Sequence, residues 1–257
     1  MPFRQHRGGG KSGRRIHDMS EVWDDEWTRR ARRTEECERS LNWQQIRRHL
    51  RPPGRVLEAG CGLGHWVKFL HDAGFEAWGI DFAPVGIEKS RQLWPELEAR
   101  LSVGDLRHMP YEDNFFDAIV SFGAIEHNED GIEGAVRDMI RVLKPGGLLY
   151  CTVPCMNRLR YLGLMALQDW MVCNPTIRRL TGRTPEVAFY QYVFYRREYE
   201  QVLRQAGFEW VALYPLAPMV FCGGHQAIHR RILGQIHRLS PWTMTHMMAA
   251  VCRKPNR

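Results

Sequence analysis

The sequence predicts an α/β protein whose mostly parallel sheet is covered by helices on both faces. One observation behind this prediction is that short apolar runs alternate with amphipathic helical patterns across residues 54–154. Another is that most of these runs end near glycine, proline or acidic turn residues. Strands that are separated by helical crossovers run parallel in a shared sheet. The chain has 257 residues, 44% of them hydrophobic, which is enough to enclose one sizeable core.

Each strand is predicted from an apolar run, and each helix from the period of its apolar residues. The strands are expected over residues 55–58, 76–80, 100–103, 116–121 and 148–153. Helices are expected over residues 64–73 and 131–143, where apolar side chains recur on one face. The Lys-Pro-Gly-Gly sequence at residues 144–147 then ends the second helix and turns the chain back into a strand.

The alternation lapses after residue 154, which predicts an insertion over residues 155–195 that forms a helical cap. Residues 196–257 are expected to complete the sheet with a helix, a strand and a final strand over residues 244–252. Between these two strands lies a basic amphipathic pattern, with Ile228, Ile232, Ile236 and Leu239 on one side.

The segment before the core is predicted to have two parts. Residues 1–20 combine glycines with five Lys and Arg residues and no apolar run, so they are expected to be a disordered basic tail. Residues 21–52 are expected to form an N-terminal helical lid, and residues 21–257 a single domain. Trp23 and Trp27 lie four residues apart, so they either cover a ligand or pin a helix to the domain.

Charge is distributed unevenly along the chain. Residues 1–55 hold 14 Lys and Arg against 8 acids, residues 56–150 hold 8 against 16, and residues 151–257 hold 14 against 5. An acidic middle segment favours a cationic or hydroxyl-rich ligand, and basic flanks favour an anionic surface. The seven cysteines show neither disulfide-framework nor zinc-site spacing, so we expect reduced thiols, no metal site and a cytoplasmic location.

A glycine-rich loop follows the first predicted strand, at Glu58-Ala59-Gly60-Cys61-Gly62-Leu63-Gly64. Glycines let the backbone turn tightly and approach a ligand where a Cβ would stand in the way. The dinucleotide fingerprint needs its third glycine one residue later, where His65 stands, which disfavours a redox cofactor.

Two aspartates end the next two strands. Asp81 ends the second strand, where a carboxylate commonly accepts both ribose hydroxyls. Asp105 follows the third strand, where it is expected to face an adenine amino group. The alternative for each aspartate is that it only caps a helix.

These motifs resemble those of the class I S-adenosylmethionine-dependent methyltransferases. The resemblance covers residues 54–154 and consists of Glu-x-Gly-Cys-Gly-x-Gly, Gly-Ile-Asp, Gly-Asp, Phe-Asp-x-Ile and Leu-Lys-Pro-Gly-Gly, in that order. It implies a Rossmann-like seven-stranded sheet whose last strand is antiparallel, and S-adenosyl-L-methionine as the cofactor. It also implies that Gly60, Cys61 and Gly62 cradle the methionine part and that Glu58 orients this loop and the amino group. The remaining cofactor residues that it implies are Gly64, Asp81, Phe82, Asp105, Leu106, Ser121, Phe122 and Gly123.

Candidates for the acceptor side are fewer. Methyl transfer depends mainly on alignment, but a hydroxyl acceptor gains from a general base of near-neutral pKa, and His127 is the best-placed candidate. Its alternative role is structural. Tyr190 and Tyr192 are expected to line an acceptor pocket or to pack in the core. Cys155 follows Pro154, but without the companion motif of cytosine methyltransferases it is expected to be an ordinary thiol.

The predicted function is methylation, most plausibly at oxygen, of a small molecule, a sugar or a lipid-linked glycan. The insertion is expected to shape the acceptor site, and its apolar and arginine residues allow contact with an anionic membrane. The alternatives are an RNA methyltransferase, suggested by the basic flanks, and a non-catalytic scaffold that keeps the fold. Nucleic acid is the less expected partner because the fourth strand lacks the Asn/Asp-Pro-Pro-Tyr/Phe motif. The sequence leaves the oligomeric state open.

Overall fold

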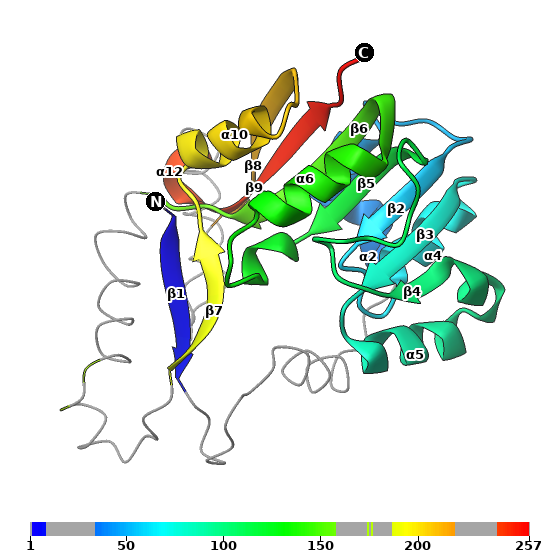
Figure 1. Ribbon diagram of the computed structural model, residues 1–257, viewed down its shortest axis with the longest axis horizontal. Helices are drawn as coiled ribbons and strands as arrows, with labels where there is room; N and C mark the ends of the chain where they lie inside the picture. Colours follow the sequence, from blue (N-terminus) through cyan, green and yellow to red (C-terminus); the bar gives the residue numbers. More distant parts are fainter. Residues whose placement is uncertain are drawn as a thin grey trace.

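The computed structural model describes residues 2–8, 34–157, 174, 176, 187–218 and 241–256 (Figure 1). Within these residues, the main sheet has seven strands in the order β4-β3-β2-β5-β6-β9-β8. In chain order they are β2 (Arg55–Ala59), β3 (Glu76–Asp81), β4 (Leu101–Val103), β5 (Phe116–Phe122), β6 (Leu143–Pro154), β8 (Trp210–Pro218) and β9 (Thr245–Arg253). The first five run parallel, and β9 lies antiparallel between β6 and β8. The predicted Rossmann-like sheet with an antiparallel last strand is confirmed.

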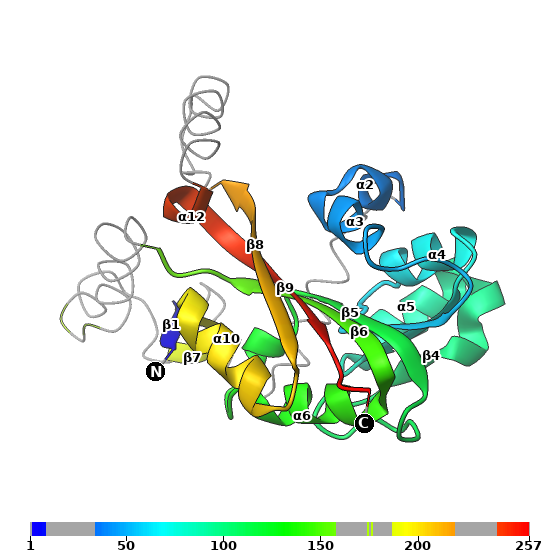
Figure 2. The ribbon, with the colours of Figure 1, turned by 90° about the horizontal axis from the view of Figure 1, so that it is seen from above.

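Helices cover both faces of this sheet, as predicted, and Figure 2 separates the two layers. On one face lie α6 (Glu133–Val142) and α10 (Arg196–Gln205), and on the other lie α2 (Thr34–Arg39), α3 (Leu41–Ile46), α4 (His65–Asp72) and α5 (Pro84–Leu93). Three short helical segments join these elements: η1 (Pro95–Arg100), η2 (Ile125–His127) and α12 (Pro241–Met244). None of the described helices is both long and apolar enough to cross a bilayer.

Each face of the sheet has its own apolar core. On the α6 face, Val136 and Met139 pack with Ile119 of β5, and all three are fully buried. On the α4 face, Val67 and Leu70 pack in the same way, with Val120 of the same strand β5. Neighbouring residues of β5 therefore serve opposite cores, as the alternation of side chains along a strand requires.

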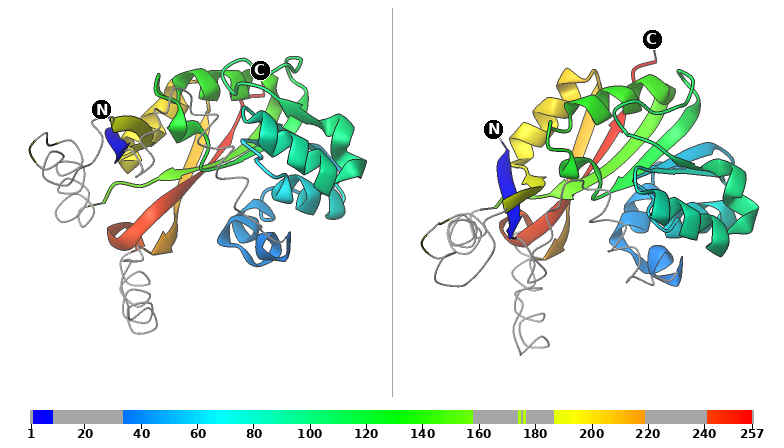
Figure 3. Two further views of the ribbon diagram at one scale, coloured as in Figure 1. Left: turned by 90° about the horizontal axis from the view of Figure 1, so that it is seen from below. Right: turned by 60° about the horizontal axis from the view of Figure 1, so that its bottom comes forward.

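The N-terminal segment departs from the prediction. Residues 1–20 were expected to be disordered, but β1 (Phe3–Gly8) is a strand that pairs antiparallel with β7 (Val187–Val193). The tail prediction is therefore wrong for this segment, because its pairing partner lies about 180 residues away, beyond the reach of local sequence patterns. In Figure 3 the two strands lie well away from α2 and α3.

The predicted insertion is described only in part. Its last part includes the strand β7, in line with the alternative that the aromatic residues there belong to a strand packed on the core. Residues 158–173, 175 and 177–186 of the insertion, the basic pattern around residues 228–239, and Trp23 and Trp27 lie outside the described residues. The structure also contains a helix that the sequence patterns did not predict, α5 at residues 84–93.

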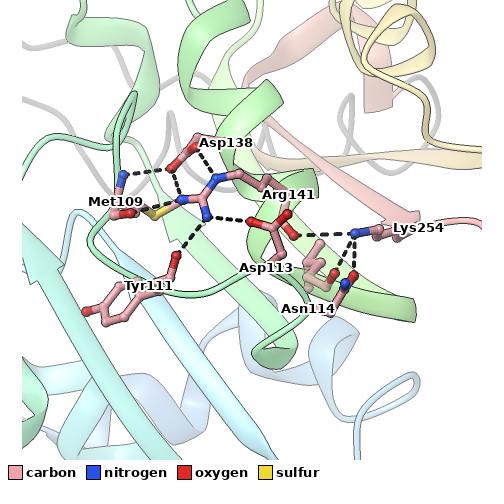
Figure 4. Close-up of polar contacts among 8 residues, drawn as sticks. Met109, Tyr111, Asp113, Asn114, Asp138, Arg141 and Lys254 are labelled. Carbon is pink, nitrogen blue, oxygen red and sulfur yellow. Dashed lines mark hydrogen bonds and ion pairs between the residues drawn. The ribbon is translucent and has the colours of Figure 1, made fainter.

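A hydrogen-bond cluster around Arg141 fixes the long connection between β4 and β5 (Figure 4). The guanidinium of Arg141, on α6, donates to the carbonyl oxygens of Met109 and Tyr111 and to the carboxylates of Asp113 and Asp138 at 2.7–3.0 Å. A guanidinium has five N–H groups in a rigid fork, and these five bonds occupy that fork. The connection begins with residues 104–106, so the cluster supports the loop that was predicted to border the adenine.

We expect Arg141→Ala to lower the free energy of unfolding by about 2–3 kcal/mol, because the carbonyl oxygens of Met109 and Tyr111 lose this donor and the carboxylates of Asp113 and Asp138 lose their ion pair. Urea denaturation followed by circular dichroism measures this. Arg137→Ala is the matched control, since Arg137 is exposed on the same helix, and it should change stability by less than about 0.5 kcal/mol. Equal losses in both variants would contradict a structural role for the cluster.

Candidate active site

The glycine-rich loop between β2 and α4 adopts backbone conformations that explain its glycines. Gly60, Gly62 and Gly64 have φ angles of +82°, +50° and +69°, in the left-handed region. Space is limiting as well, because a Cβ added to Gly60 would lie 2.3 Å from the Cβ of Ala124. Larger residues at position 60 are therefore excluded, both by strain and by the close approach of the loop that follows β5.

The backbone N–H groups of this loop donate hydrogen bonds within the protein. The N–H groups of Gly60 and Cys61 donate to the carbonyl oxygen of Ile80 at 2.8 and 3.0 Å, and the N–H of Gly62 donates to Asp81 Oδ2 at 2.8 Å. Residues 60–62 were expected to cradle a ligand with their backbone. The absence of Cβ atoms at Gly60 and Gly62 leaves space beside this loop, but its N–H groups point toward β3 and not toward a ligand. A loop built this way lacks the row of donors that a polyphosphate site offers.

Two buried carboxylates stand at the ends of the central strands. Asp81 is 4% exposed, and its Oδ1 accepts a hydrogen bond from the N–H of Ala83 at 2.9 Å. Glu58 is also 4% exposed, and its Oε2 accepts from the N–H of Val67 at 3.1 Å, in the first turn of α4. Both acids thus hold the start of the following helix, which was the alternative for Asp81. A carboxylate offers about four acceptor positions, so these bonds leave capacity for a ligand.

Two cavities open at the carboxyl ends of the parallel strands. The first, of about 240 Å³, is lined by Glu36, Cys37, Ser40, Asn42, Glu58, Gly60, Cys61, Leu63, His65, Trp66 and Phe122. The second, of about 350 Å³, is lined by Phe82, Asp105, Leu106, Arg107, Ala124, Ile125, His127, Asn128, Glu129 and Ala135. Gly60 lines the first and Ala124 the second, and these residues are close neighbours, so the cavities adjoin. The structure thereby gathers most of the sequence-predicted site residues at one edge of the sheet.

Some predicted residues lie elsewhere. Ser121 is fully buried and donates to the carbonyl oxygen of Ala59 at 2.8 Å, so it joins two strand ends and lines neither cavity. Gly62, Gly64, Asp81 and Gly123 also line neither cavity, although Phe82, the residue after Asp81, lines the second, and Gly64 instead caps α4. Phe122 does line the first cavity, where its ring stacks on Trp66 with centroids 4.4 Å apart.

Asp105 has a partner that the sequence analysis missed. Both oxygens of its carboxylate accept hydrogen bonds from the guanidinium of Arg107, and Arg107 also bonds to Asp130 at 2.8 Å. Hydrogen bonds from this guanidinium lower the pKa of Asp105. The three residues join the loop after β4 to the loop after η2, along the second cavity. An Asp followed two residues later by Arg was the only available signal, and it is too common to be specific.

The acceptor-side candidates are placed as follows. His127, at the end of η2, lines the second cavity. Tyr192 of β7 donates its hydroxyl to the carbonyl oxygen of Glu129 at 2.8 Å, and Glu129 lines the same cavity. Tyr190 lies on β7, and its side chain is outside the described part of the structure. Cys155 is buried, in line with the expectation of an ordinary thiol.

Glu126 precedes His127, and the sequence leaves open whether it orients the imidazole or is solvated. Its side chain is 2% exposed, and its Oε2 has no hydrogen-bond partner within the described part of the chain. Burial raises the pKa of Glu126 from 4.5 to about 8. The titratable groups that face it, the Cys151 thiol and the Tyr199 hydroxyl, are also buried with raised pKa values. Glu126 is therefore mainly protonated at neutral pH, directly beside His127.

Comparison with known proteins identifies the family. The family model described as a methyltransferase domain matches residues 29–213. The chain belongs to this methyltransferase family, which confirms the resemblance seen in the sequence motifs, and the cofactor of the class is S-adenosylmethionine.

The chain also resembles individual relatives. It is 36% identical over 101 residues to the 2-methyl-6-phytyl-1,4-hydroquinone methyltransferase of Synechocystis, an alignment that covers 38% of this chain and 31% of that protein. It is 29% identical over 185 residues to the demethylmenaquinone methyltransferase of Staphylococcus aureus, covering 68% and 74%. The match thus spans about a third of the Synechocystis protein and about three quarters of the Staphylococcus protein.

Solved structures share the fold. A Haloferax volcanii methyltransferase in complex with the Trm112 methyltransferase activator superposes with a TM-score of 0.63 at 16% identity, covering 95% of this chain and 99% of that one. Phosphoethanolamine N-methyltransferase 2 of Haemonchus contortus, bound to S-adenosyl-L-methionine, gives 0.56 at 17% identity and covers 83% and 52%. At these identities the similarity establishes the Rossmann-like methyltransferase fold.

The burial of Glu126 predicts a pH-dependent stability difference from Glu126→Gln. Below pH 4.5 the carboxyl is protonated in both folded and unfolded chains, so ionisation does not affect stability. As pH rises toward 8, only the unfolded chain ionises, and the wild type loses stability. The advantage of Glu126→Gln should therefore grow by about 4 kcal/mol between pH 4.5 and 8.

Urea denaturation of both proteins across this pH range tests the prediction. Glu112→Gln is the control, because Glu112 is exposed and lies outside the helices, and its replacement should change stability by less than about 0.5 kcal/mol across this pH range. A constant difference for Glu126→Gln as well would show that this carboxyl is ionised in the folded protein.

Proposed function

We propose that this chain transfers the methyl group of S-adenosylmethionine to a hydroxyl group of a small acceptor. The observation that carries the proposal is that two buried carboxylates, Asp81 and Glu58, are each held by backbone N–H groups at the ends of neighbouring strands. Glu58 lines the first cavity, and Phe82, the residue after Asp81, lines the second. Carboxylates suit a ligand that carries a sulfonium, an ammonium and hydroxyl groups. The N–H groups of Gly60, Cys61 and Gly62 are already hydrogen-bonded within the protein, which disfavours a phosphate ligand.

The residues fit this cofactor part by part. Asp81, fixed by the N–H groups of Gly62 and Ala83, would accept the ribose hydroxyls. Phe82 is 39% exposed at the second cavity and would lie against the adenine, with Leu106 on the same cavity wall. Glu58 and the small residues of the glycine loop would receive the methionine part in the first cavity. When bound, the cofactor supplies an electrophilic methyl group on a good leaving group.

In this proposal the acceptor approaches from the His127 side of the second cavity, while the Phe82 and Leu106 side receives the adenine. His127 lines that cavity and would accept the proton of the acceptor hydroxyl, because histidine is the side chain most often used as a general base. Tyr192 fixes the chain at Glu129 and so supports the same wall. Tyr190 stays a prediction as an acceptor-site residue.

The acceptor class that we propose is a small hydroxylated molecule, either a hydroquinone, a sugar or a lipid-linked glycan. The names of the Synechocystis and Staphylococcus relatives, which refer to a phytyl hydroquinone and to demethylmenaquinone, support a quinone-type ring in the acceptor and do not specify the atom that is methylated. A cytoplasmic enzyme that meets a lipid-linked acceptor at an anionic membrane surface would also account for the basic flanks.

The acceptor is tested by incubating the purified chain with methyl-labelled S-adenosylmethionine and separate fractions of quinols, lipids, glycans, small metabolites and RNA. We expect label in a small hydroxylated molecule or a lipid-linked acceptor, as a methyl ether stable to mild base. Label in RNA alone would overturn the proposal.

His127→Ala should lower kcat by about 100-fold or more, with the loss partly recovered at high pH.

The ribose assignment is tested by Asp81→Asn. We expect the Kd for S-adenosylmethionine to rise by about 10- to 100-fold, because a neutral amide replaces an anionic acceptor of two hydroxyl groups. Isothermal titration calorimetry measures the Kd, and unchanged far-ultraviolet circular dichroism shows that the fold is kept. Asp72→Asn, at an exposed aspartate of α4, is the control. An unchanged Kd in Asp81→Asn would reject the assignment.

A further inference from the structure

The helix pair α2–α3 is held against the sheet by specific contacts. Cys37 of α2 is 6% exposed and Ile46 of α3 is fully buried, both within the apolar core of the α4 face. The Trp43 ring meets the Phe69 ring of α4 edge-on, with centroids 5.0 Å apart.

One hydrogen bond ties the pair to the sheet itself. The hydroxyl of Tyr150, a fully buried residue of β6, donates to Asn42 Oδ1 at 2.9 Å. A buried hydroxyl without a hydrogen-bond partner is unfavourable, so this bond holds the first turn of α3 against β6. The pair is therefore built into the domain and presents a defined wall.

That wall forms one side of the first cavity. Glu36, Ser40 and Asn42 line it from α2–α3, opposite Glu58, Gly60 and Cys61 of the glycine loop. Among the described residues that line this cavity, two are carboxylates and none is Lys or Arg. Such a cavity favours a cation, and it opens directly on the loop that the proposed function assigns to the methionine part of the cofactor.

We propose that Glu36 joins Glu58 in binding the α-ammonium group of the cofactor, so that α2 completes the methionine end of the site. This inference rests on the proposed function, and it adds a residue that lies outside all of the sequence motifs. Glu36 is distinguished from its neighbours by position alone. Glu35 and Glu38 lie on the same short helix but do not line the cavity, so they provide matched controls.

The test compares three ligands by isothermal titration calorimetry: S-adenosylmethionine, S-adenosylhomocysteine and 5′-methylthioadenosine. The first two carry the α-ammonium, only the first carries the sulfonium, and the third lacks the amino-acid part. For Glu36→Gln we expect the Kd of the first two ligands to rise about 10-fold, and that of the third to change less than about 2-fold. Glu38→Gln should leave all three values unchanged.

Each other outcome overturns the inference in its own way. A loss confined to S-adenosylmethionine would assign Glu36 to the sulfonium, and equal losses for all three ligands would indicate a disturbed fold. Unchanged affinities would remove Glu36 from the site while the proposed function stands. A wild-type chain that binds none of the three ligands would instead overturn the proposed function, and this inference with it.

Tyr150→Phe provides a second variant that keeps the buried ring. Losing the bond to Asn42 should raise the Kd of both ammonium ligands about 3-fold and leave 5′-methylthioadenosine unaffected. Since both substitutions act through the same helix pair, their effects should be less than additive in the double variant. Strict additivity would contradict a shared wall.

Discussion

The site depends on the hydrogen bonds that join the glycine loop to the end of β3. Asp81 accepts the N–H of Gly62 with one oxygen and that of Ala83 with the other, so a single carboxylate fixes the turns after two neighbouring strands. The carbonyl of Ile80 accepts two further N–H groups of the loop. In phosphate-binding loops the backbone N–H groups point at the ligand. Here the N–H group of Gly62 instead positions the Asp81 carboxylate. The polar groups left for a ligand are therefore carboxylates, which suit the positive charge and the hydroxyl groups of S-adenosylmethionine.

The second half of the site is supported at a distance. The connection that carries Asp105 and Leu106 has little regular structure, and Arg141 of α6 holds it through two of its carbonyl oxygens. Lys254, close to the C-terminus, reinforces the same region by donating to Asn114 and to the carbonyl of Leu143 at 2.8 Å (Figure 4). The residue after the last strand thus braces the far end of the connection whose first residues, Asp105 and Leu106, line the second cavity.

Much of this architecture could be predicted from sequence because its signals are local. An apolar run that ends at Glu58, followed by alternating glycines, specifies both a buried strand and a tight turn, and Asp81 at the next strand end adds the polar partner. The pairing of β1 with β7, the bond from Tyr150 to Asn42 and the bridge from Asp105 to Asp130 join residues far apart along the chain. Contacts between residues so far apart leave no periodic pattern in the sequence. The sequence leaves Glu126 open between orienting His127 and being solvated, because no local pattern shows that its side chain is buried.

The most direct test is a crystal structure of the chain with S-adenosylhomocysteine, which does not require the acceptor to be known. We expect density in both adjoining cavities, with the ribose hydroxyls within hydrogen-bond distance of the Asp81 carboxylate and the adenine between Phe82 and Leu106. Density for the nucleoside away from the carboxyl ends of β2 and β3, or cavities left empty at saturating ligand, would contradict the account.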